Sequence, residues 1–140
     1  MIADYLFDSG VLILHLRNQS GYPELTNRLA DEADVHISTM TRFEIVRGMN
    51  DRERAVTFTL LNSLETLDVT SQIADQAGEL IRSWKPRGVT LGDADALIAA
   101  TAFQHGLILV TTNPKHFPMP EVTVLQADEQ GSLTPYKGVS

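Results

Sequence analysis

The chain has no cysteine, and this absence excludes both disulfide bonds and thiolate metal sites. A chain of 140 residues nevertheless suits one domain, which at this size buries a substantial core without covalent or metal staples. The lack of cysteine fits a reducing compartment, and we expect a cytoplasmic protein.

Long apolar runs and a sorting signal are also missing. No run of about 18 apolar residues occurs, which argues against a membrane span. The first residues lack a basic segment and a small-residue cleavage site, and Asp4 and Asp8 interrupt them, so we expect no signal peptide. A net charge of −7 argues against a protein that coats nucleic acid by charge alone. It remains compatible with an enzyme that holds a cation between carboxylates and touches a polyanion locally.

Hydrophobic periodicity predicts strands that alternate with helices along the chain. The predicted strands are residues 2–7, 35–39, 65–70, 107–112 and 122–126. The predicted helices are residues 9–18, 23–33, 40–49, 52–64, 71–84 and about 91–105. This order predicts an α/β fold with a largely parallel sheet that helices cover on both faces. We expect one folded domain over residues 1–127 and a loose polar tail over residues 128–140.

Polar residues that follow the predicted strands are candidates for a site, because such sheets bind ligands beyond the carboxyl ends of their strands. Asp8 directly follows the first strand, and Asn113 directly follows the fourth. Glu44 lies in the first turns of the helix after the second strand. Asp93 and Asp95 open the helix that leads into the fourth strand. We therefore expect these residues to gather at one end of the sheet.

Each acid also has a purely structural explanation. Asp8 could cap the helix that it precedes, and both Thr41–Glu44 and Thr90–Asp93 have the spacing of a capping box. A convergence of carboxylates, by contrast, creates repulsion that a divalent cation relieves. Magnesium and manganese prefer oxygen ligands, and a cation beside a phosphate can activate water for an in-line displacement. Together the acids therefore indicate nuclease chemistry.

Helix periodicity separates Asp93 from Asp95 only weakly. The two residues lie about 160° apart around the helix, so both can scarcely bind one ion. Asp95 lies too deep for an end cap, whereas Asp93 can pair with Thr90, which favours Asp95 as the ligand and leaves the role of Asp93 open. Phe103 lies about 180° from the centre of the predicted buried face. That face consists of Ala94, Leu97, Ile98, Thr101, Ala102 and His105.

Three segments carry a resemblance to a known family: "YLFDSGVLI", "ISTMTRFEIVRG" and "DADALIAATAFQHGLILVTTNPKHF". In this order and spacing, over roughly residues 4 to 117, they resemble the PIN domain and, within it, the VapC-type toxins of toxin–antitoxin pairs. The resemblance implies a single α/β/α domain with a mainly parallel five-stranded sheet. It also implies an endoribonuclease that depends on Mg²⁺ or Mn²⁺.

By position, the resemblance implies that Asp8, Glu44 and Asp95 are metal ligands and that Asn113 is a fourth catalytic residue. Many members have an acid where this chain has Asn113, so a firmly held second metal ion is not implied. The residues expected to orient water or to contact the RNA are Ser9, Arg42, Arg47 and Lys115. The four histidines are not expected to be catalytic, and His105 is expected to pack in the core.

The resemblance further implies an RNA substrate, a homodimer, and a small antitoxin protein that covers a groove near the site, with no membrane partner. Phe103 is a candidate for the antitoxin or dimer contact. One alternative is a PIN-like fold that has lost catalysis and binds RNA or protein, which only Asn113 favours. Another is a different metal phosphohydrolase, although "DSGVL" after the first strand lacks a D-x-D nucleophile loop.

Overall fold

The computed structural model describes residues 4–138, over which strands and helices alternate as the sequence predicts. The strands are β1 (Tyr5–Phe7), β2 (Val35–Ser38), β3 (Glu65–Leu67), β4 (Ile108–Thr111), β5 (Val124–Ala127) and β6 (Leu133–Tyr136). The helices are α1 (Ser9–Leu16), α2 (Tyr22–Glu32), α3 (Thr39–Gly48), α4 (Arg54–Ser63), α5 (Ser71–Trp84) and α6 (Asp93–His105). Short 3-10 helices are η1 (Asp51–Glu53), η2 (Lys85–Arg87) and η3 (Pro114–His116). Residues 2 and 3 of the first predicted strand lie outside the described residues.

The sheet has six strands in the order β3-β2-β1-β4-β5-β6, and all neighbours are parallel except β5 and β6. The α/β fold with a mainly parallel sheet is confirmed, but the predicted count of five strands is wrong. The additional strand, β6, lies in the segment that was predicted to be a loose tail. The sequence of this strand, "LTPY", has no apolar pattern that predicts it. Its first and last residues, Leu133 and Tyr136, are partly buried and pack against the hydrophobic core.

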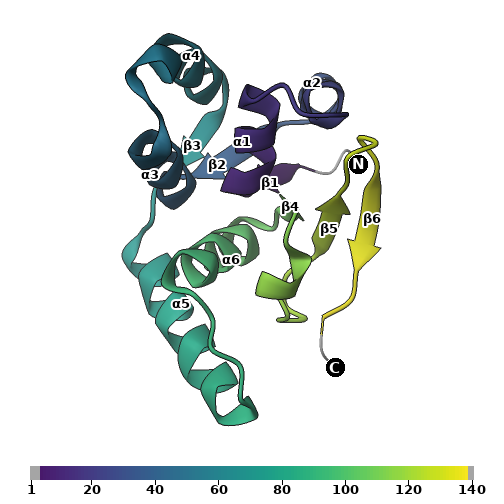
Figure 1. Ribbon diagram of the computed structural model, residues 1–140. Helices are drawn as coiled ribbons and strands as arrows, with labels where there is room; N and C mark the ends of the chain where they lie inside the picture. Colours follow the sequence, from purple (N-terminus) through teal and green to yellow (C-terminus); the bar gives the residue numbers. More distant parts are fainter. Residues whose placement is uncertain (1–3, 139–140) are drawn as a thin grey trace.

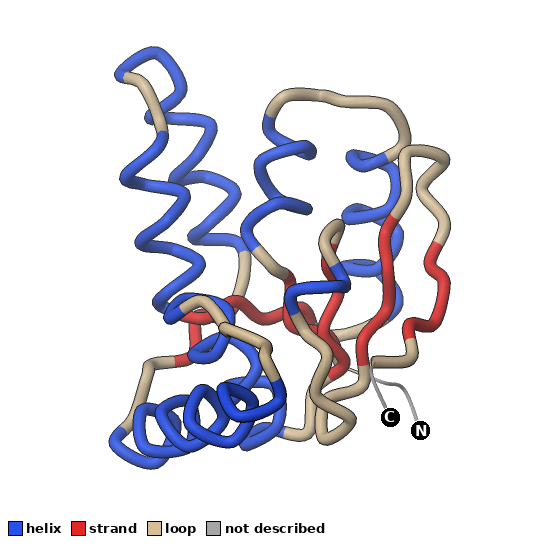
Figure 2. The backbone as a smooth tube through the Cα atoms, turned by 60° about the horizontal axis from the view of Figure 1, so that its bottom comes forward, coloured by secondary structure: helices blue, strands red, loops and turns tan. Residues whose placement is uncertain are grey.

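Helices lie on both faces of the sheet (Figures 1 and 2), and alternating residues of the central strands pack toward one face or the other. Leu6 and Leu109 pack against α5 and α6, which lie side by side. Phe7 and Val110, the next residue in each strand, pack against α1–α4 on the other face. This period-two alternation is what two helical layers require of a buried parallel sheet.

The turn between β5 and β6 packs against the connection from α1 to α2. Gly131 adopts φ +77°, and a Cβ there would lie 2.8 Å from the carbonyl oxygen of Gly21. A Cβ on Gly21 would in turn lie 2.6 Å from the Gly131 nitrogen. The backbones approach closely because both residues are glycine, and Gly21 N–H donates to the Glu129 carbonyl at 2.7 Å. This contact ties the last strand to the first helical layer.

Helix α6 is buried more widely than the predicted stripe. Its buried residues are Ala96, Ile98, Ala99, Ala100, Thr101 and Ala102, while Ala94 and Leu97 are only partly buried. Small side chains let the helix pack against α5 and the sheet at once, so no narrow face exists. The prediction that His105 packs in the core is wrong: the helix leaves the core after Ala102, and His105 is exposed.

None of the helices within residues 4–138 is long and apolar enough to cross a membrane.

Candidate active site

The candidate site lies where the order of the sheet reverses direction. From β1 the chain builds outward through β2 to β3, and α5 and α6 then carry it back to β4 on the other side of β1. The carboxyl ends of β1 and β4 therefore flank a topological switch point, where open α/β sheets bind ligands. Asp8 follows β1 at this point, and Thr111 ends β4 beside it.

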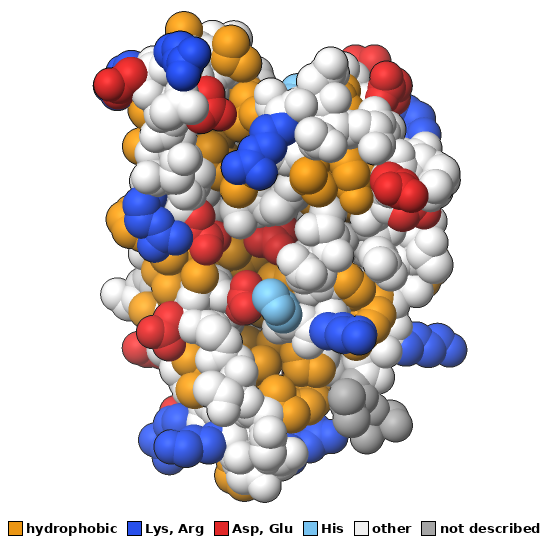
Figure 3. All heavy atoms as spheres, in the orientation of Figure 1, with side chains coloured by type: hydrophobic (Ala, Val, Ile, Leu, Met, Phe, Trp, Pro, Cys, Tyr) orange, Lys and Arg blue, Asp and Glu red, His pale blue; other side chains and the backbone are white. Residues whose placement is uncertain are grey.

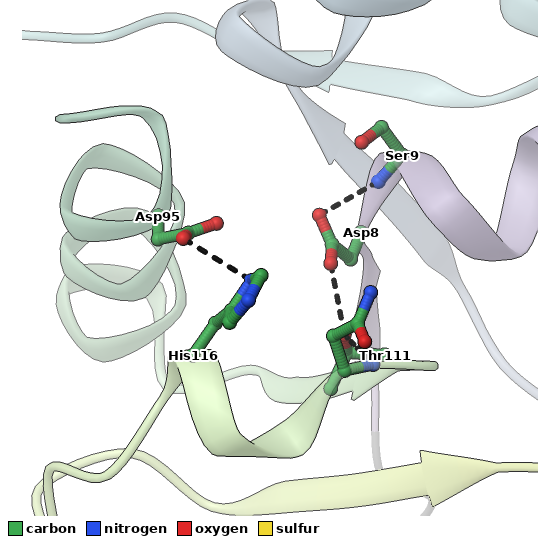
Figure 4. Close-up of polar contacts among 6 residues, drawn as sticks. Asp8, Ser9, Asp95, Thr111 and His116 are labelled. Carbon is green, nitrogen blue, oxygen red and sulfur yellow. Dashed lines mark hydrogen bonds and ion pairs between the residues drawn. The ribbon is translucent and has the colours of Figure 1, made fainter. Parts of the chain in front are cut away.

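Asp8 is held rigidly beneath the surface, with 7% of its area exposed. One carboxylate oxygen accepts the Ser9 N–H at 2.8 Å, and the other accepts the Thr111 hydroxyl at 2.8 Å (Figure 4). Burial raises the pKa of Asp8 above its ordinary value, while the hydrogen bonds from Thr111 and Ser9 oppose that shift. Asp8 also caps α1, so the structural explanation for this acid holds alongside the functional one.

Glu44 faces Asp8 from α3. Partial burial raises the pKa of Glu44, and the negative charges of Asp8 and then Asp95 raise it further. The Ser9 side chain and the charge of Arg47 oppose this shift in the pKa of Glu44. The structural explanation for Glu44 is wrong, because Ser38 caps α3 and no Thr41–Glu44 capping box forms.

Asp95 reaches the same region from the first turn of α6. Burial raises its pKa, the charge of His116 lowers it, and the charge of Asp8 raises it. Asp93, two residues earlier on the same helix, is exposed. The predicted Thr90–Asp93 capping box does not form, because Gly92 is the N-cap of α6 and has no side chain to cap with.

Gly92 also determines how much room Asp95 has. A Cβ at this position would lie 3.2 Å from the Asp95 Oδ2 atom, closer than most real Cβ contacts. The absence of a side chain on the N-cap therefore leaves the Asp95 carboxylate free to turn toward Asp8.

Two site residues were not found by sequence reasoning. Thr111 is fully buried, donates to Asp8, and accepts the Asn113 N–H at 3.0 Å, so it links two candidate residues. His116, in η3, places its Nδ1 atom 3.4 Å from Asp95 Oδ2 (Figure 4). A hydroxyl that ends an apolar strand was an available signal for Thr111. The pair with Asp95 joins residues that are 21 positions apart in the sequence, which local spacing does not reveal.

The other predicted site residues differ in whether their side chains already contact other parts of the protein. Asn113 is exposed and directly follows β4, and Lys115 is exposed on η3. Arg47 stacks over the Phe43 ring at 5.2 Å, and its charge lowers the pKa of Glu44. The Arg42 guanidinium donates to Asn62 at 2.7 Å and to the Leu61 carbonyl at 3.4 Å, so it already ties α3 to α4.

The acids gather at one place without enclosing an ion by themselves. Within residues 4–138, no group of three or more histidine, aspartate or glutamate side chains has the spacing to hold a metal ion. The face seen in Figure 3 shows acidic and histidine side chains in its middle, with basic side chains around them. The oxygen-only set of Asp8, Glu44 and Asp95 suits magnesium, which keeps several waters and needs only one or two carboxylates.

Comparisons with known proteins agree with this geometry. The PIN domain family model matches residues 5–120. Ribonuclease VapC10 of Mycobacterium tuberculosis is 36% identical over 116 residues, which cover 83% of this chain and 87% of the relative. The tRNA(fMet)-specific endonuclease VapC of Salmonella typhimurium is 26% identical over 118 residues, 81% of this chain and 89% of the relative.

Solved structures show the same fold. The DNA-bound VapBC structure from Salmonella typhimurium matches with a TM-score of 0.76 and 26% identity, covering 89% of this chain and 97% of that one. VapBC2 from Rickettsia felis, bound to a promoter DNA fragment, matches with a TM-score of 0.79 at 23% identity, covering 89% and 99%. The fold and the acids at its switch point define an α/β domain of nuclease type. The chain belongs to the PIN domain family, alongside the VapC ribonucleases.

Proposed function

We propose that this chain is an endoribonuclease that hydrolyses RNA phosphodiester bonds with Mg²⁺ or Mn²⁺ and acts as the toxin of a type II toxin–antitoxin pair. The observation that carries the proposal is the convergence of Asp8, Glu44 and Asp95 at the switch point, where the charges of Asp8 and Asp95 raise the pKa of Glu44 and the charge of Asp8 raises the pKa of Asp95. The similarity to ribonuclease VapC10 supports the choice of RNA as substrate. A cytoplasmic location belongs to the same proposal.

The residues present fit a divalent cation in their chemistry. Three partly or fully buried carboxylates with raised pKa values repel one another, and a cation is the group that relieves this repulsion. The Thr41 hydroxyl, one helical turn before Glu44, is buried without a hydrogen-bond partner among the described residues. Asp8, Glu44 and Asp95 would hold the ion partly through bridging water, because among residues 4–138 no three such side chains have the spacing to enclose it directly.

Each side chain has a distinct task in this scheme. A bound cation supplies Lewis acidity and a more acidic water. The Glu44 carboxylate, partly buried on α3, would hold the ion together with Asp8 and Asp95. Asp8 provides a fixed negative charge, because Ser9 and Thr111 lock both of its oxygens. The exposed Asn113 amide can donate a hydrogen bond to a phosphate oxygen, a role that needs no charge.

A protein antitoxin is the partner that we propose, and a homodimer is the proposed assembly. The solved relatives include a toxin–antitoxin complex from Klebsiella pneumoniae with a TM-score of 0.70 and 27% identity. Two large aromatic side chains, Phe43 and Phe103, are about half exposed at 54% and 46%. Exposed aromatic residues of this kind are enriched at protein interfaces.

The proposal is tested by comparing Asp95→Asn with Asp93→Asn, two identical changes two residues apart. We expect Asp95→Asn to lower RNA cleavage a hundredfold or more, because loss of a ligating charge costs several kcal/mol and each 1.4 kcal/mol is about tenfold. Asp93→Asn should retain most activity, since Asp93 is exposed and only complements the helix dipole. Cleavage of single-stranded RNA is measured in magnesium, in manganese and in EDTA, with folding checked by circular dichroism.

Other outcomes separate the competing functions. Full activity of both variants would remove Asp95 from the mechanism, and activity of Asp95→Asn with loss of activity in Asp93→Asn would reverse the assignment of the two residues. Turnover of small phosphate esters in place of RNA would indicate a phosphohydrolase. RNA binding without cleavage in any metal would indicate a binding module that has lost catalysis.

A further inference from the structure

A polar cavity of about 330 Å³ adjoins the acids on the side of η3, at the lower end of the roughly 300–1,000 Å³ typical of ligand pockets. It shares Asn113 and His116 with the candidate active site. Two of its residues, Gln126 on β5 and Tyr136 on β6, lie beyond residue 120, where the family match ends. Its lining consists of Thr112, Asn113, Pro114, Lys115, His116, Gln126 and Tyr136.

The sheet register connects this cavity to the acids. Thr111, which donates to Asp8, pairs with Gln126 on the neighbouring strand, so both side chains point to the same face. Tyr136 pairs with Val124, two residues before Gln126, and therefore lies on that face as a diagonal neighbour of Gln126. A group that contacts Asp8 can thus continue along one sheet face toward Tyr136.

The chemistry of the lining suits one nucleotide. Tyr136 packs partly against the core, so its ring is a fixed platform on which a base can stack. The exposed Gln126 amide offers both a donor and an acceptor for a base edge. Lys115 offers an ammonium group for a phosphate. Entry into such a cavity requires an unstacked base, which single-stranded RNA provides.

Charge distinguishes this cavity from another cavity that Glu44 lines. That smaller cavity, of about 100 Å³, is lined by Glu44, Glu53 and Arg17 among other residues. The cavity beside η3 contains Lys115 and His116 and no carboxylate. The lining of the second cavity therefore favours a polyanion more than the lining of the first does.

We infer that the cavity formed by Lys115, Gln126 and Tyr136 is a subsite for the nucleotide next to the scissile phosphate in single-stranded RNA. The base stacks on Tyr136 and meets Gln126, while Lys115 contacts the flanking phosphate. This inference rests on the proposed ribonuclease function, and it assigns a substrate-recognition role to the last strand of the sheet.

Binding of a short fluorescent single-stranded RNA to the full chain in EDTA tests the subsite without cleavage. Tyr136→Leu should weaken binding roughly five- to hundredfold, the range for loss of one stacked base, while Tyr136→Phe should retain it. Gln126→Ala should weaken binding with the fold intact, because its side chain is exposed. Gln104→Ala, an exposed glutamine on α6 that bonds to Gln76, is the matched control and should bind as the unaltered chain does.

The phosphate contact and the base contact are tested separately. Lys115→Ala should lower the slope of log affinity against log salt by about 0.7, the value for one phosphate of a single strand. Lys85→Ala, the same charge change on η2, should leave the slope unchanged. An RNA with abasic residues should bind the unaltered chain as weakly as normal RNA binds Tyr136→Leu.

The subsite is overturned if the unaltered chain binds no RNA, if Tyr136→Leu and Gln126→Ala bind like the unaltered chain, or if abasic RNA binds as well as normal RNA. The proposed function fails on a different measurement, the absence of RNA cleavage in magnesium or manganese.

Discussion

Asp8 and Asp95 lie on opposite sides of the candidate site and are held in very different ways. Asp8 is 7% exposed, and both of its oxygens accept hydrogen bonds of 2.8 Å. The Asp95 side chain is 26% exposed, and its one ion pair is 3.4 Å long, to a histidine side chain that is 56% exposed. The Asp8 side chain is therefore fixed by buried hydrogen bonds, whereas the Asp95 side chain is held only by a longer, solvent-exposed ion pair.

Because of this difference, a substitution at Asp8 affects both the stability of the fold and the charge of the site, whereas a substitution at Asp95 affects mainly the charge. A change at Asp8 disturbs the cap of α1 and the contact with Thr111 as well as the charge at the site. A change at Asp95 removes charge with few other consequences. When a cation binds at this site, the Asp8 carboxylate is already held in one orientation by its hydrogen bonds. The Asp95 carboxylate would have to leave its ion pair with His116 to contact the cation.

The largest expected effect on stability comes from the cation itself. A ligand that binds only the native state adds about 2.7 kcal/mol at a hundred times its dissociation constant, which raises the melting temperature on the order of 10 °C. We expect millimolar Mn²⁺ to produce such a shift relative to EDTA, and Asp95→Asn to reduce it. A melting temperature that is equal in Mn²⁺ and EDTA, with no heat of binding by calorimetry, would contradict the metal site.

The next largest expected effect on stability is at Thr111, whose hydroxyl fixes the Asp8 carboxylate. Thr111→Val keeps the shape of the side chain but removes the donor to Asp8 and the acceptor for the Asn113 N–H. It should cost about 1–3 kcal/mol of unfolding free energy in urea titrations. RNA cleavage should fall about tenfold or more, while Thr111→Ser should preserve both properties.

The matched comparison is a substitution of His116, the partner of Asp95. His116→Ala removes a partly exposed ion pair with Asp95, which should cost less than about 1 kcal/mol. Equal destabilisation by Thr111→Val and His116→Ala would show that the two acids are held alike and would refute the contrast.

A smaller effect concerns pH. Burial is the first cause of the raised pKa of Asp8, Glu44 and Asp95, so the folded metal-free chain binds protons more tightly than the unfolded chain at these groups. Their contribution to stability is therefore full below the ordinary carboxyl range and is lost as pH rises through the raised values. Asp95→Asn should thus stabilise the chain in EDTA more at pH 7 than at pH 4.

The smallest expected effect on folding is at Phe103, which is 46% exposed on α6. Phe103→Ala should leave unfolding by urea nearly unchanged and should weaken dimerisation or antitoxin binding, measured by ultracentrifugation and calorimetry. Unaltered association would assign this ring to the free surface, and unfolding of the variant would assign it to the core.

Sequence patterns predicted the long elements well because their periodicity is a property of one segment. Residues 71–84 were predicted as a helix, and α5 spans Ser71–Trp84. Asp8 and Asp95 could be proposed as site residues for a similar reason, since one follows a strand and the other lies in the first turn of a helix. Their convergence could be inferred because the carboxyl ends of parallel strands lie at one edge.

The failures come from features that no single segment contains. His105 was placed in the core by helix periodicity, but the last turn of α6, from Phe103 to His105, is exposed. The strand β6 depends on pairing with β5 and on glycine contacts with residue 21, neither of which its polar sequence displays. Thr111 and His116 gain their roles only from partners that the fold brings to them.

The two outer strands of the sheet determine how other chains can approach it. At one edge, β3 is three residues long and begins with the exposed Glu65. At the other edge, β6 contains Pro135, which has no N–H to offer to a further strand. Short, charged or proline-bearing edges discourage edge-to-edge pairing of sheets. Aggregation by strand addition is therefore disfavoured at both edges, and a partner has to recognise helix surfaces and side chains in place of the open backbone.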